Sequence, residues 1–145
     1  MNFMTAPSFI DTNILVYAFA DTGDDRHAKA RLLVEELLDG QNASLSVQIL
    51  REFYTVATRK VRKPLSHAQA VATIEDLCLA CRVVDDTLPQ LNRAMEFAES
   101  HGLSIWDASI AAAAEAAGCG VLFTEDLAHG AMTGNVRVTN PLLKL

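Results

Sequence analysis

The stretch Ser8 to Phe19, SFIDTNILVYAF, constrains the fold of this chain more than any other. A short nonpolar run ends at Asp11-Thr12-Asn13, and a second nonpolar run follows at once. This pattern predicts a buried strand that turns directly into a helix, with the Asp11 carboxylate at the junction. Because open α/β sheets bind ligands at the carboxyl ends of their strands, Asp11 is a candidate functional residue. The alternative is that Asp11 only caps the helix.

Strand and helix patterns alternate along the rest of the chain. Short nonpolar runs at 43–46, 82–85, 120–123 and 136–139 predict further strands, and nonpolar residues at helical spacing lie between them. Such alternation predicts an α/β fold in three α/β/α layers, with helices on both faces of a small, mainly parallel sheet of four to five strands. The 145 residues fit a single domain spanning 1–145.

Three further acids stand at comparable places. Asp126 follows the nonpolar run that ends at Phe123, as Asp11 follows the first strand. Glu52 lies at the edge of the nonpolar face of a helix that Ser46 is expected to cap and Pro64 to end, and Asp107 lies near the start of an alanine-rich helix. We therefore expect these acids to approach Asp11.

A cluster of carboxylates has a clear chemical use. Mg²⁺ and Mn²⁺ prefer oxygen ligands, and Mg²⁺ takes one or two carboxylates while it keeps waters and phosphate oxygens. Without a cation, neighbouring acids repel one another. Structural alternatives remain open for single residues: Asp107 is spaced from Ser104 as in a capping box, and Asp126 or its neighbour Glu125 fits a turn.

Composition limits the functional classes. The formal net charge of −6 argues against a protein that binds nucleic acid through a broadly basic surface, but a nuclease with bound cations is compatible with it. Three cysteines, an odd number, fit a reducing compartment, and we expect Cys78 and Cys81 to be buried and inert. No targeting segment or membrane-length nonpolar run is recognised, so we expect a cytoplasmic protein.

Four segments together resemble the motifs of one family. They are Phe9 to Tyr17 (FIDTNILVY), Ser46 to Phe53 (SVQILREF), Ser104 to Ala108 (SIWDA) and Leu122 to Gly130 (LFTEDLAHG). In this order and spacing they resemble the PIN-domain ribonucleases, specifically the VapC-type toxins of bacterial type II toxin-antitoxin systems. The resemblance spans nearly the whole chain, and no acidic position departs from it.

The resemblance implies a function and a site. It implies a metal-dependent endoribonuclease toxin that hydrolyses RNA, with tRNA among its substrate classes, and that a VapB-type antitoxin inhibits. It further implies a homodimer with no membrane association, and one or two Mg²⁺ or Mn²⁺ ions. The implied catalytic residues are Asp11, Glu52, Asp107 and Asp126, with Asp11, Asp107 and Asp126 as metal ligands, and with Thr12, Asn13 and Thr124 as polar supports. A contribution from Glu125 stays open.

Two neighbouring features have open interpretations. Arg59, Lys60, Arg62 and Lys63 follow the Glu52 helix, either as solvated cations at a helix end or as contacts to RNA phosphates. Trp106 adjoins Asp107, and we interpret it as core or wall rather than as a platform for base stacking.

Two other functions remain as alternatives. The first is a catalytically weak PIN-fold module that binds RNA or protein without cleavage. The second is a phosphotransferase in which Asp11 becomes phosphorylated, although the haloacid-dehalogenase pattern places a second Asp where this chain has Asn13.

Overall fold

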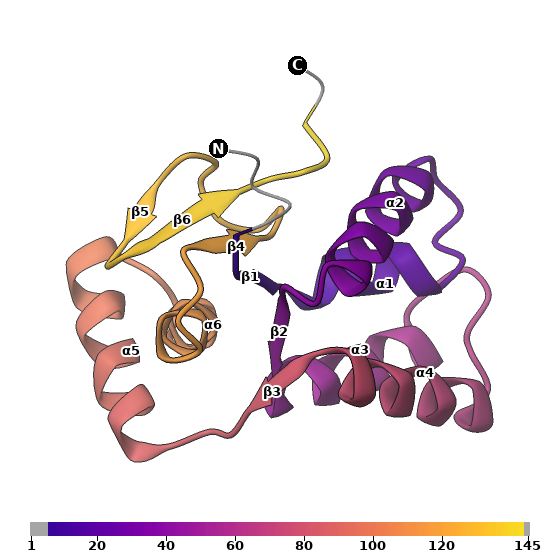
Figure 1. Cartoon of the computed structure of the whole chain (residues 1–145), viewed down its shortest axis with the longest axis horizontal. Coiled ribbons are helices and arrows are strands. Elements are labelled where there is room, and N and C mark those ends of the chain that lie inside the picture. Colours follow the sequence, from indigo (N-terminus) through magenta and orange to yellow (C-terminus); the bar gives the residue numbers. More distant parts are fainter. Residues whose placement is uncertain (1–5, 144–145) are drawn as a thin grey trace.

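The computed structural model describes residues 6–143 and contains one sheet with helices on both sides (Figure 1). The strands are β1 (Ser8–Ile10), β2 (Ala43–Ser46), β3 (Arg82–Val84), β4 (Val121–Phe123), β5 (Met132–Thr133) and β6 (Val136–Thr139). The helices are α1 (Thr12–Phe19), α2 (Arg26–Asp39), α3 (Val47–Arg59), α4 (His67–Ala80), α5 (Leu88–His101) and α6 (Ile105–Ala116). The predicted α/β class is confirmed.

The strand order is β3-β2-β1-β4-β6-β5, and all pairings are parallel except that of β5 with β6. Helices α5 and α6 lie on one face of the sheet, and α1 to α4 lie on the other, which gives three layers (Figure 1). Since β1 is central and pairs with both β2 and β4, the segments that follow these strands meet at one edge of the sheet.

The core lies between the central strands and the helices that cover them. All three residues of β1 and all four of β2 are buried, as expected for parallel strands covered on both faces. Helix α6 packs against β2, β4 and β6. Its buried alanines Ala108, Ala111, Ala112, Ala113 and Ala114 allow this close approach, because they have almost no side chain to separate helix and sheet.

Side-chain caps fix the starts of the helices that carry the acids. The Ser46 hydroxyl accepts a hydrogen bond from the backbone N–H of Ile49 at the start of α3, as predicted. At the start of α6, the Ser104 hydroxyl accepts one from the N–H of Asp107 (3.1 Å). The Asp107 side chain does not return the bond in the part of the chain that the structure describes, so Asp107 is not the second member of a capping box.

Three sequence predictions are wrong in detail. The sheet has six strands and not four to five, because the two residues of β5 are too few to show strand periodicity. Helix α3 ends at Arg59, before Pro64, where Lys60 leaves helical geometry (φ −115°, ψ 9°). Cys78 is exposed and Cys81 half-buried, since they lie at the outer end of α4. Within residues 6–143, no helix has the length and nonpolar character to cross a membrane.

Candidate active site

The site is built around Asp11, at the junction of β1 and α1. Its backbone N–H donates to the carbonyl oxygen of Phe123 at the end of β4 (2.9 Å), which joins the two strand ends. One carboxylate oxygen accepts from the N–H of Thr12 (2.7 Å), and the other accepts from the hydroxyl of Thr124 (2.6 Å). Asp11 is thus the predicted cap of α1, and its role extends further because its second oxygen binds the β4 segment.

Burial dominates the electrostatics of Asp11. The residue is only 3% exposed. Burial raises the pKa of its carboxyl from 3.8 to about 6, the hydrogen bonds from Thr124 and Thr12 oppose the rise, and the charges of Asp126 and Glu52 add to it. The charged form of the Asp11 carboxyl is therefore unfavourable in the folded protein.

The four predicted acids line one cleft, with a volume of about 420 Å³. Asp11 and Asp126 reach it from the ends of β1 and β4, Glu52 from α3, and Asp107 from the first turn of α6. The sequence pattern thus identified acids that do meet in space. In the described part of the chain, none of these four acids forms a salt bridge.

Glu52 is held by two side chains. One carboxylate oxygen accepts a hydrogen bond from the hydroxyl of Thr12 (3.0 Å), and the other accepts from the amide nitrogen of Gln48 (3.1 Å). Thr12 therefore serves both acids, because its backbone binds Asp11 and its hydroxyl binds Glu52. Gln48 was not identified from the sequence, although its position one helical turn before Glu52 is the signal that would have found it.

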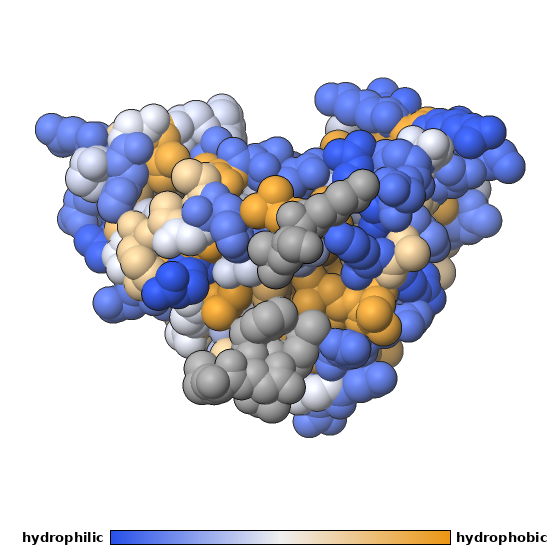
Figure 2. All heavy atoms as spheres, turned by 90° about the horizontal axis from the view of Figure 1, so that it is seen from above, coloured by the Kyte–Doolittle hydropathy of each residue, from blue (hydrophilic) through white to orange (hydrophobic). Residues whose placement is uncertain are grey.

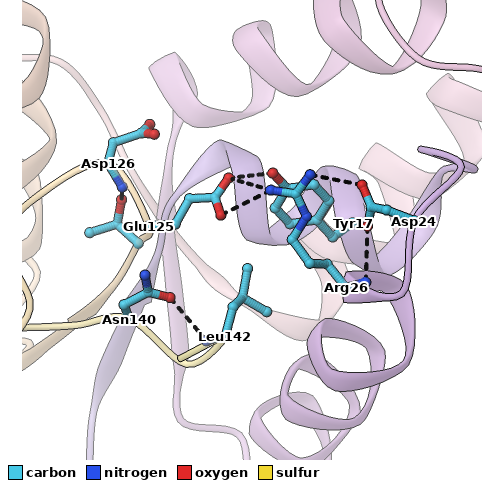
Figure 3. A network of polar contacts seen from close by, with 8 residues as sticks. Tyr17, Asp24, Arg26, Glu125, Asp126, Asn140 and Leu142 are labelled. Atoms are coloured by element: carbon cyan, nitrogen blue, oxygen red, sulfur yellow. Dashed lines mark hydrogen bonds and ion pairs between the residues drawn. The ribbon is translucent and has the colours of Figure 1, made fainter. Parts of the chain in front are cut away.

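Asp126 and Glu125 are neighbours with different surroundings (Figure 3). Glu125 points toward α1 and α2, where it accepts a hydrogen bond from the Tyr17 hydroxyl and forms an ion pair with Arg26 (3.3 Å). Asp126 lines the cleft, and its backbone N–H donates to the Thr124 hydroxyl (3.1 Å). Burial, followed by the charges of Asp107 and Glu125, raises the pKa of Asp126. Of the two acids, only Asp126 lines the cleft.

Asn13 lines the same cleft with hydrogen-bonding capacity to spare. Both polar atoms of its side chain are buried, and within the described residues neither makes a hydrogen bond of good geometry, although the side chain lies close enough to Asp126 to lower the pKa of that acid. A buried amide with so little hydrogen bonding is costly and calls for an explanation by a ligand or water. Its location beside the acids fits a site that binds a hydrated cation or a phosphate group.

The predicted basic residues do not gather at the cleft. Lys60 lines it, but Arg59, Arg62 and Lys63 do not. The side chain of Arg62 instead packs over Gly23, and the backbone of Lys63 pairs with Asp21. The second cation of the cleft is Arg51, which sequence reasoning missed although it directly precedes Glu52.

The site fits a divalent cation by its chemistry but not by a ready-made cage. Carboxylate oxygens and an amide are the donor set of Mg²⁺ or Mn²⁺. Among residues 6–143, however, no group of three or more His, Cys, Asp or Glu side chains is arranged to hold a metal ion. Mg²⁺ needs only one or two protein carboxylates, because waters and substrate oxygens complete its shell.

Comparison with known proteins agrees with this geometry. The family model for the PIN domain matches residues 8–133. The chain belongs to the PIN domain family. The family resemblance seen in the sequence is therefore confirmed, and the matched range contains the four predicted acids of the cleft. No curated protein sequence matches the chain.

Solved structures of similar fold include toxins and their complexes. VapC20 of Mycobacterium tuberculosis, a Sarcin-Ricin loop cleaving toxin, is 26% identical, with a TM-score of 0.65 over 82% of this chain and 91% of that one. A toxin-antitoxin complex from Klebsiella pneumoniae (20%, TM-score 0.69) and VapBC2 from Rickettsia felis bound to a promoter DNA fragment (20%, TM-score 0.64) each cover 92% of this chain and 97% of theirs. The VapC-type resemblance is confirmed.

A second hollow includes Phe123, the last residue of β4, in its lining. It has a volume of about 480 Å³, and nonpolar residues of α2 and the C-terminal segment, including Leu32, Leu33, Pro141 and Leu143, line it. Phe123 directly precedes Thr124, which binds Asp11. Figure 2 shows nonpolar surface near the centre of the face that is seen from above the view of Figure 1, with hydrophilic surface at its flanks.

Proposed function

We propose that this PIN domain, a single domain over residues 1–145, is a metal-dependent endoribonuclease that hydrolyses RNA phosphodiester bonds as a cytoplasmic toxin. The observation that carries the proposal is the environment of Asp11. Its carboxylate is 3% exposed and lies in a cleft with three more acids, without a cationic partner among the described residues. An unpaired charge at such a place is costly, and a divalent cation would offset the cost.

Each residue of the cleft has a proposed role. Asp11, Asp107 and Asp126 hold the cation, and Thr12, Thr124 and Asn13 orient these acids and their waters. Glu52 or Asp107 accepts a proton from the attacking water. Lys60 and Arg51 bind phosphate oxygens of the RNA. When bound, Mg²⁺ or Mn²⁺ supplies a water of lowered pKa and neutralises charge on the scissile phosphate.

The direct test is cleavage of single-stranded RNA or tRNA by the purified protein with Mg²⁺. Asp11→Asn and Asp107→Asn should abolish cleavage while the proteins stay folded. The matched control is Asp76→Asn on α4, where the same substitution removes an exposed acid away from the cleft. Equal activity of all four proteins would contradict the proposal.

A binding module without catalysis is the second candidate. The observation in its favour is that, within the described residues, no three candidate ligands are already arranged around one point. Calorimetric titration with Mn²⁺ separates the two candidates. Binding that Asp11→Asn weakens supports the enzyme, and no binding supports the module.

The geometry speaks against a phosphorylated Asp11. Both of its oxygens accept short hydrogen bonds, and its burial leaves little access for a phosphoryl donor. Beryllofluoride should therefore not modify Asp11, and mass spectrometry of the treated protein checks this.

An antitoxin partner follows from the same proposal. The acidic cleft would attract a basic arm, and the nonpolar hollow beside α2 would receive nonpolar side chains of a VapB-type helix. Leu32 in that hollow is 60% exposed. Co-expression with a cognate VapB-type antitoxin should restore growth, and Leu32→Asp should prevent the rescue without loss of RNA cleavage. The proposed homodimer is tested by sedimentation velocity.

A further inference from the structure

Trp106 occupies an unusual place for the single tryptophan of the chain. It lies in the first turn of α6, directly before Asp107, and is 70% exposed. Of the interpretation of Trp106 as core or wall, the core position is therefore wrong. A large aromatic side chain left open to solvent beside an acidic cleft usually has a binding partner.

Trp106 lines two adjoining hollows. One is the acidic cleft, and the other has a volume of about 390 Å³. Nonpolar side chains of Leu88, Leu91 and Ile105 form part of the second hollow. Trp106 thus forms the wall between the acids and a largely nonpolar recess, which we call the Trp106 recess.

The Trp106 recess also has polar groups with unused capacity. Gln48 donates one amide hydrogen to Glu52, which leaves its second hydrogen and its oxygen. The Thr87 hydroxyl accepts from the N–H of Gln90, and its own hydrogen remains. Nonpolar walls with a few hydrogen-bonding groups suit a nucleobase, which has flat faces and polar edges.

The two hollows differ in the charged residues that line them. Lys60 and Arg51 line the acidic cleft, whereas Asp86 lines the Trp106 recess, which has no Lys or Arg among its described lining residues. Lys60 caps the C-terminal end of α3, Gln48 lies in its first turn and Glu52 lies between them, so Lys60 and the recess lie on opposite sides of Glu52, while Arg51 directly precedes that acid. A phosphate is favoured near Lys60 and Arg51 and disfavoured beside Asp86.

We propose that Trp106 is a stacking platform for the base of the nucleotide next to the scissile phosphate, with that base held in the Trp106 recess. The proposal rests on the proposed RNA cleavage and adds a specificity-determining residue to it. Every base has a face that stacks on an indole, so the platform selects single-stranded RNA, in which bases can turn outward. The hydrogen bonds at Gln48 and Thr87 then discriminate between bases.

The test uses Trp106 as its own reporter. In the Asp11→Asn protein, which should bind without cleavage, a short single-stranded RNA of mixed sequence should quench the tryptophan fluorescence to saturation. Fluorescence anisotropy of labelled RNA then compares variants in the same background. Trp106→Ala should weaken binding about 5- to 150-fold, the effect of losing one stacked base, and Trp106→Phe should weaken it less.

The matched control is Leu79→Ala on α4, because Leu79 is exposed (88%) and lies outside both hollows. It should bind RNA as the background protein does. Unchanged fluorescence on RNA binding, or equal affinity of the Trp106→Ala protein, would overturn the proposal. A change from dimer to monomer in Trp106→Ala with unchanged RNA affinity would overturn it too, since Trp106 would then contact a second copy. The proposed function fails separately, if the wild-type protein with Mg²⁺ cleaves no RNA.

Discussion

Two acidic regions of this PIN domain contrast with each other. On the outer side of α6, Glu115 pairs with Arg93 of α5 (2.7 Å) and also accepts from the N–H of Asn135 in the β5–β6 turn (3.4 Å). In the cleft, Asp11 lies beside other acids and hydroxyls, and it forms no salt bridge within the described residues. In the first region an acid joins elements of the fold through a cation, whereas in the second Asp11 caps α1 and binds Thr124 while its charge has no cation paired with it.

The direction of the pKa shifts expresses this difference. Arg93 holds the pKa of Glu115 below its usual value of 4.5, so the folded protein favours the charged form. Burial raises the pKa of Asp11 to about 6, so the folded protein disfavours the charged form. Stability explains the first acid, whereas the raised pKa of the second fits the cation that we propose for the cleft.

The largest expected effect is a separation of activity from stability. Asp11→Asn should reduce RNA cleavage more than about 100-fold, beyond the usual effect of losing a residue that only supports a metal ligand. Without metal, the same variant should be more stable, on the order of 1 to 3 kcal/mol, because a disfavoured charge is removed. Urea unfolding and a cleavage assay check the two effects. An Asp11→Asn protein that is less stable and fully active would contradict this contrast between Asp11 and Glu115.

The next effect is the pH dependence of the metal-free protein. The folded pKa of Asp11 lies above its ordinary value, at about 6 against 3.8, so the folded state binds the proton more tightly. As pH falls from neutral through 6 toward 4, Asp11 should therefore add stability, on the order of 3 kcal/mol. Urea unfolding across this range should show the gain, and Asp11→Asn should remove most of it. Saturating Mn²⁺ should reverse the trend, because metal binding requires the charged form.

A smaller effect on stability is expected from a substitution in the β5–β6 turn, where Glu115 accepts a hydrogen bond from Asn135. Gly134 has φ +59°, and an added Cβ would meet the Glu115 carboxylate and the ring of Phe97 (2.9 Å). Gly134→Ala should destabilise the fold by about 2 to 3 kcal/mol, from backbone strain plus displacement of Glu115. Gly130→Ala is the matched control, because Gly130 also has positive φ (+84°) but open space, and it should cost only about 1 kcal/mol. Thermal unfolding measures both, and equal losses would contradict the role of Glu115.

The smallest effect is expected from Glu115→Gln. The pair with Arg93 is partly exposed, with side chains 40% and 22% accessible, so solvent screens it. The variant should lose about 1 kcal/mol at neutral pH and keep full cleavage activity. Because the folded pKa of Glu115 is lowered, its contribution should vanish as pH falls through that pKa, the opposite direction to Asp11. Denaturant titrations at neutral and acidic pH test both statements.

Sequence patterns predicted the parts of the site that depend on local structure. Asp11 and Asp126 were placed correctly because parallel strands end at one edge of the sheet, and Glu52 and Asp107 because Ser46 and Ser104 fix the starts of their helices. These relations need only the period of each element and its cap. Their chemical roles stay predictions until the variants are measured.

The parts that sequence reasoning left open or got wrong depend on contacts between distant segments. The ties of Glu125 to Tyr17 and Arg26 involve residues far apart in sequence, which no periodicity reveals. The Lys and Arg residues at 59–63 are close in sequence, which allowed the interpretation of one phosphate-binding patch. The chain turns there, and of these residues only Lys60 lines the cleft. The exposure of Trp106 depends on how α5 and α6 pack, which its neighbours in sequence do not determine.

The pairing of β1 with β4 also sets when during synthesis the cleft of this protein can form. Asp11 leaves the ribosome well before Thr124, the residue 113 positions later whose hydroxyl orients it. Chains fold from the N-terminus as they emerge, so β1 and β2 can pair early while the other side of β1 stays open. The cleft then forms only after β4 has emerged, and a truncated chain that ends before β4 should lack the complete cleft and with it the proposed RNA cleavage.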